Sequence, residues 1–71
     1  MSRKQDQHYA AGDLKVMTLP EWAALNSISL FTAKAIIARG DGPRVIQLSK
    51  RRIGIRVGDN RAWQEQRLRA V

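Results

Sequence analysis

The sequence predicts a small α+β domain in which two short helices joined by a tight turn precede a β-hairpin and a last helix. Three observations predict this fold class. Helix caps and apolar stripes at helical spacing occur twice between residues 18 and 40. Two apolar runs follow over residues 45–57, and the second alternates as a half-buried strand does. The chain has 71 residues, so it forms one domain at most.

The first helix is expected over residues 19–25 or 19–26. Thr18 and Glu21 have the spacing of a capping box, in which each side chain accepts a hydrogen bond from the other's backbone N–H. Pro20 falls in the first turn, where a missing N–H costs little. The residues expected to face the core share one side of this helix and are Leu19, Trp22 and Ala23.

The second helix is expected over residues 30–39. Asn26 and Ser27 interrupt the helical pattern because their short polar side chains compete for backbone hydrogen bonds. Ser29 is the expected N-cap, and Gly40 ends the helix because it can adopt a left-handed conformation. The expected core residues lie at i, i+3 and i+4 and are Ala33, Ile36 and Ile37.

Two helices of this length with a short turn have the proportions of a helix-turn-helix, whose second helix can enter the major groove of DNA. The outward residues of that helix would be Phe31, Lys34, Ala35 and Ala38. Of these, only Lys34 can donate a hydrogen bond to a base edge, so we expect modest direct readout, with DNA shape and backbone contacts contributing much of the binding. Two interpretations of Phe31 remain open at this stage, contact with DNA and contact with another protein.

A β-hairpin is expected after the helices, with strands over residues 45–48 and 53–57 and a link over residues 49–52. Next to a helix-turn-helix, such a hairpin is a wing, and the expected fold is a small winged helix-turn-helix with a two-stranded antiparallel wing. The tip of the wing would carry the consecutive cations Lys50, Arg51 and Arg52, which suit phosphates or a narrow minor groove. The alternative is a charged hairpin edge that discourages pairing with other strands.

The two ends of the chain complete the expected organisation. Residues 1–15 have no sustained period and predict a flexible N-terminal arm, which leaves residues 16–71 as the domain. A last helix would open at residues 58–60 and run to about residue 68, with Asp59 either as its N-cap or as a favourable charge in its first turn. Ala62 and Trp63 are expected to pack on the core. Leu68 lies off their face, available to a neighbouring subunit or part of a frayed end.

The charge is concentrated in one part of the chain. The formal net charge is +7, and residues 34–56 hold seven cations against Asp41 alone. A basic segment that coincides with a helix-turn-helix favours a polyanionic partner, double-stranded DNA, over a merely solvated surface. Besides the wing, Arg39, Arg44 and Arg56 are candidate phosphate contacts.

Other function classes find little support in the sequence. There is no cysteine and His8 is the only histidine, so no metal site, cofactor site or acid–base constellation is expected, and we do not expect an enzyme. No apolar run approaches the roughly 18 residues of a membrane span and no signal peptide opens the chain, which predicts a soluble bacterial cytoplasmic protein without membrane or small-molecule partners. An RNA-binding basic protein would need exposed aromatics on the sheet, and neither expected strand carries one.

The ordered motifs resemble a known family. Thr18-Leu19-Pro20-Glu21-Trp22 is similar to the TLxEW opening of phage excisionases. The motifs that follow resemble the AlpA-like and excisionase group of MerR-type winged helices, and they are Ser29-Leu30-Phe31-Thr32, Arg39-Gly40, Pro43, Lys50-Arg51-Arg52 and Ala62-Trp63. The resemblance covers residues 17–68, and the chain looks most like a recombination directionality factor of an integrative and conjugative element.

The resemblance implies a function in the bacterial nucleoid. Such proteins bind tandem sites beside an attachment site and bend the DNA so that a tyrosine integrase excises the element, and some also regulate transcription. A plain AlpA-like regulator is the alternative. By residue match, the recognition-helix contacts would be Ser29, Phe31, Thr32, Lys34 and Ala35. The chain departs from the family in having apolar residues at 30, 31 and 35, which favours cooperative head-to-tail assembly along DNA as the source of affinity.

Overall fold

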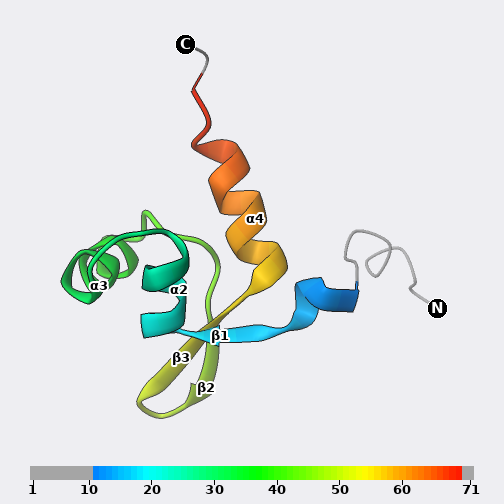
Figure 1. The fold of residues 1–71 in the computed structure, drawn as a ribbon. Coiled ribbons are helices and arrows are strands. Elements are labelled where there is room, and N and C mark those ends of the chain that lie inside the picture. The colour runs from blue at the N-terminus through cyan, green and yellow to red at the C-terminus, as the bar shows by residue number, and fades with distance from the viewer. Residues whose placement is uncertain (1–10, 70–71) are drawn as a thin grey trace.

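The computed structural model describes residues 11–69 as a small α+β fold with three α-helices and a three-stranded antiparallel sheet (Figure 1). In chain order the elements are the 3-10 helix η1 (Ala11–Leu14), β1 (Val16–Thr18), α2 (Leu19–Leu25), α3 (Leu30–Ala38), β2 (Ile46–Ser49), β3 (Arg52–Arg56) and α4 (Val57–Gln66). No helix in this part of the chain is both long and apolar enough to cross a membrane.

The two caps predicted for α2 and α3 are confirmed. Thr18 Oγ1 accepts from the Glu21 N–H at 3.2 Å, and Glu21 Oε1 accepts from the Thr18 N–H at 2.8 Å, which completes the capping box. Ser29 Oγ accepts from the Thr32 N–H at 3.0 Å and begins α3. Gly40 has a φ of 80° directly after the C-cap residue of α3, so it ends this helix in the left-handed region as expected.

The sheet differs from the expected two-stranded hairpin by one strand. Its order is β1-β3-β2, so β3 is the central strand and β1 is an added edge, with Met17 opposite Ile55. The link between β2 and β3 is also shorter than predicted, because β2 runs to Ser49 and β3 begins at Arg52. A register shift between Gln47 and Ser49 leaves Leu48 as the bulged residue of β2.

The core lies where α2 and α3 meet the sheet. Its buried residues are Met17, Trp22, Ala23, Ala33, Ile36 and Ile55. Trp22 belongs to the core, as predicted, and its ring lies 5.2 Å from that of Trp63 on α4. Trp22 Nε1 donates to Asn60 Oδ1 at 2.8 Å, so the buried indole N–H has a partner. Trp63 packs against the core as expected, but Ala62 is exposed, because neighbouring positions on an α-helix face directions about 100° apart and only one of the two can face the core.

The last five residues of the N-terminal arm expected over residues 1–15 are folded. Asp13 in η1 is only 3% exposed and accepts two hydrogen bonds from Arg61 on α4, both at 2.6 Å. The Lys15 carbonyl accepts from the Val57 N–H at 2.9 Å, which continues the link to α4. Residues 11–15 are therefore part of the fold. The rest of the expected arm, including His8, lies outside the described residues.

The last helix begins one residue earlier and ends about two residues earlier than expected. Arg56 is the N-cap residue of α4, without a side-chain cap bond. Asp59 lies in the first turn and accepts from Arg56 Nε at 2.8 Å, so of its two predicted roles the structure shows the first-turn carboxylate. Leu68 follows the helix and is exposed.

Candidate nucleic-acid interface

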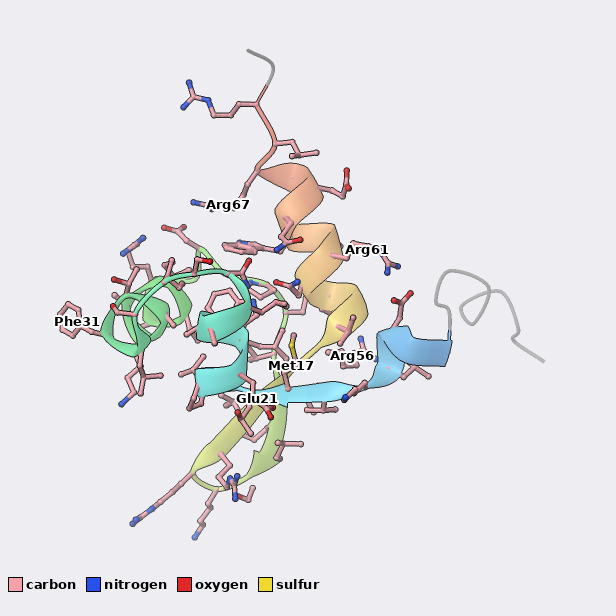
Figure 2. The ribbon with its side chains drawn as sticks, viewed as in Figure 1. Met17, Glu21, Phe31, Arg56, Arg61 and Arg67 are labelled. Atoms are coloured by element: carbon pink, nitrogen blue, oxygen red, sulfur yellow. The ribbon has the colours of Figure 1, made fainter. Side chains whose placement is uncertain are left out.

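The outer side of α3 carries an exposed aromatic ring and a lysine. Phe31 is 82% exposed and projects away from the rest of the molecule (Figure 2). Lys34 and Ala38 are exposed as the periodicity predicts, whereas Ala35 is half-buried. This side faces outward because the buried residues of α3 occupy the opposite side. Of the four residues predicted to face outward, only Lys34 has a side-chain hydrogen-bond donor.

The first turn of α3 holds the two hydroxyls assigned to DNA contact by residue match. Ser29 and Thr32 are both exposed. Ser29 Oγ accepts from the Thr32 N–H and also donates to Thr32 Oγ1, each at 3.0 Å. A hydroxyl has a single proton, so that of Ser29 is used within the turn, while Thr32 keeps its own for an external acceptor. Thr32 is therefore the better placed of the two for a phosphate oxygen.

The tip of the β2–β3 hairpin brings the three predicted wing cations together. Lys50, Arg51 and Arg52 are all exposed, and within residues 11–69 none of them forms an ion pair. The Gln47 side-chain amide donates to the backbone carbonyls of Ser49 and Arg52, so it links the two ends of the turn. The hairpin thus presents three cations on a backbone that its own polar side chain holds in place.

The tip and α3 lie on the same side of the molecule. Figure 1 shows α3 and the end of the hairpin at the left and lower left, with η1 on the opposite side of the sheet region. The placement follows from packing, because α2 contacts α3 on one side and both β1 and β3 on another. The same small core therefore fixes the helix and the hairpin relative to each other.

The three further phosphate candidates have different surroundings. Arg44 is exposed and, within the described residues, outside any ion pair. Arg39 is exposed and its Nε donates to Asp41 at 2.9 Å, a solvent-screened pair that a phosphate can compete with. Arg56 is different, because its side chain is 26% exposed and bonds to the buried Asp59. The structure thus holds Arg56 inside the fold, and it is the weakest of the three candidates.

The loop that follows α3 is tied to α4 by two hydrogen bonds that the sequence analysis did not anticipate. Trp63 Nε1 donates to the Asp41 carbonyl at 2.8 Å. Arg67 Nη1 donates to the same carbonyl at 3.5 Å, and its guanidinium lies 5.0 Å from the centre of the Trp63 ring, within the range of a cation–π contact. These contacts hold the end of α3 in place, and they assign Arg67 a structural role.

A hollow of about 200 Å³ separates the start of α2 from the hairpin. Its lining residues come from two segments and are Thr18, Leu19, Pro20, Arg51, Arg52 and Ile53. Sequence reasoning placed Arg51 and Arg52 at the wing, but it did not bring Leu19 and Pro20 beside them. No local signal predicts this proximity, because it depends on the pairing of β1 with β3.

The chain matches none of the protein-family models, curated proteins or solved structures with which it was compared. Within the described residues, no three histidine, cysteine or acidic side chains gather in a way that could hold a metal ion.

Proposed function

We propose that this protein is a DNA-binding recombination directionality factor, an excisionase, built on a winged helix-turn-helix. In this proposal α2 and α3 are the helix-turn-helix and the β2–β3 hairpin is the wing. The observation that carries the proposal is the presentation of α3 and three exposed cations, at residues 50–52, on one side of the molecule. In a winged helix-turn-helix the helix enters the major groove and the cationic hairpin contacts the neighbouring backbone or minor groove. Both elements must therefore face the same side of the protein to reach one duplex.

The composition of α3 limits how the protein reads its site. Lys34 is its single donor for a base edge on the outer side, while Phe31 and the alanines can contact only apolar groups such as thymine methyls. The affinity in this proposal comes largely from phosphate contacts at Lys50, Arg51, Arg52 and Thr32, with sequence preference from DNA deformability. The protein supplies binding and bending and leaves the chemistry of recombination to the partner enzyme.

Modest single-site affinity favours binding at several adjacent sites. Neighbouring protomers that touch head to tail raise one another's effective concentration, and they form an open array along the DNA. The resemblance to excisionases supplies the biological role, in which such an array beside an attachment site directs a tyrosine integrase towards excision of a mobile element. A role as a transcriptional regulator of the same element is compatible with the same contacts.

A footprint on the element's attachment region tests the proposal, performed with and without the integrase. We expect protection of adjacent sites, a ladder of cooperative complexes in gel shifts, and excision that requires the protein. Binding and regulation without any effect on excision would leave the plain regulator as the function. Tighter binding to single-stranded RNA than to duplex DNA would overturn the proposal altogether.

A further inference from the structure

The hollow between α2 and the hairpin has an apolar part and a cationic part. Leu19, Pro20 and Ile53 line it with aliphatic surface, and Arg51 and Arg52 line it from the hairpin. Figure 2 shows the start of α2, marked by Glu21, directly above the hairpin. The start of α2 therefore supplies only aliphatic surface here, whereas the hairpin supplies both guanidiniums and the aliphatic side chain of Ile53.

The charge of this hollow is not compensated from within. None of its lining residues is acidic, and the nearest carboxylate in sequence, Glu21, is engaged by the Thr18 N–H at 2.8 Å. Neither arginine forms an ion pair within residues 11–69. A ligand that fits must combine an anion for the guanidiniums with a small, weakly polar body for the aliphatic surface. A nucleotide of a DNA strand has this combination in its phosphate and deoxyribose.

We propose that the hollow seats one sugar-phosphate unit of duplex DNA, with the phosphate on Arg51 and Arg52 and the deoxyribose against Leu19 and Pro20. This inference rests on the proposed DNA-binding function and adds a contact to it. The start of α2 becomes part of the interface, between α3 and the tip of the wing. The unit in the hollow links the wing to the helix-turn-helix, so the wing is held at a fixed distance from α3 in the complex.

Pro20 offers the sharpest test because it is exposed and lines the hollow. Pro20→Glu places a carboxylate beside the two guanidiniums, and a carboxylate in the first turn of a helix favours the fold. Pro20→Gln fills the same space without charge. Gln66→Glu at the far end of α4 is the matched control, because it makes the same change in net charge at another exposed position.

Affinity for duplex DNA is measured for the four proteins over a series of salt concentrations. We expect Pro20→Glu to weaken binding about tenfold and to reduce the salt slope by roughly 0.9, the value of one phosphate contact. Pro20→Gln should weaken binding by a smaller factor with an unchanged slope, and Gln66→Glu should stay within about twofold of the original protein. Circular dichroism and the unfolding temperature verify that each variant is folded.

The outcomes separate the two proposals. Failure of the unaltered protein to bind duplex DNA overturns the proposed function. Binding by the unaltered protein, with Pro20→Glu no weaker than Gln66→Glu, overturns the hollow as a DNA contact and leaves the function standing. The unaltered protein and Pro20→Glu are also compared for binding to an acidic peptide. If Pro20→Glu loses binding to the peptide but keeps its affinity for DNA, the hollow is a site for a protein partner and is overturned as a nucleotide site.

Discussion

A single carboxylate secures the start of α2. The hydrogen bond from the Thr18 backbone N–H, followed by the contact with the Thr18 hydroxyl, lowers the pKa of Glu21 below its ordinary value of 4.5. Because the same cap fixes the residues that lead into the hollow, this one side chain links the stability of the fold to the geometry of the candidate interface.

The lowered pKa gives the direction of a pH dependence. The folded protein binds this proton more weakly than the unfolded chain, so the contribution of Glu21 to stability is complete above the ordinary pKa and is lost as the pH falls through the lowered folded-state value. We expect the unfolding temperature to fall more steeply below about pH 4.5 in the unaltered protein than in Glu21→Gln. Thermal unfolding followed by circular dichroism at a series of pH values measures this. Parallel curves for the two proteins would contradict the assignment.

At the scale of elements, the sequence predicted the helix boundaries that are set by residues next to them in the chain. The caps at Thr18 and Ser29 and the stop at Gly40 lie within a few residues of the helices they bound, and all three are confirmed. β1 was missed because three residues carry no periodicity of their own, and this strand exists only through its pairing with β3. η1 was missed for a similar reason, since the partner of Asp13 lies 48 residues further along the chain.

β1 and β2 flank the central strand β3, and the close packing of their side chains at Gly54 leads to a stability prediction. A Cβ atom there would collide with Val16 Cγ1 on β1 and would lie 3.0 Å from Leu48 Cδ1 on β2. Valine has little rotamer freedom to move aside, so we expect Gly54→Ala to destabilise the fold by about 1–3 kcal/mol. Gly12→Ala is the control, because a Cβ at Gly12 meets no atom within 4 Å. Urea unfolding measures both, and equal midpoints would show that β1 does not pack on β3 in this way.

At the scale of the whole molecule, ion pairing divides the cations of the described residues into two groups. Arg39, Arg56 and Arg61 each face a carboxylate, at Asp41, Asp59 and Asp13. Within residues 11–69, the cations outside such pairs include Lys34 on α3 and the three at the hairpin tip. The sequence predicted this concentration of charge from residue order alone. It could not predict which arginines would be held in ion pairs within the fold, nor that the start of α2 would lie opposite the wing.

The division predicts how the affinity for DNA depends on salt. Each phosphate contact contributes roughly 0.9 to the slope of log affinity against log salt, so replacing Lys50, Arg51 and Arg52 together by Ala should lower the slope by about 2.7 and weaken binding to every duplex sequence. The matched control lowers the net charge by the same three units away from the hairpin tip, with Lys15 and Arg69 replaced by Ala and Gln66 by Glu, and should alter the slope far less because long-range charge is screened. Fluorescence anisotropy titrations across a salt series measure both slopes. Equal reductions in the two variants would mean that the protein attracts DNA through its net charge alone, without a wing that touches the backbone.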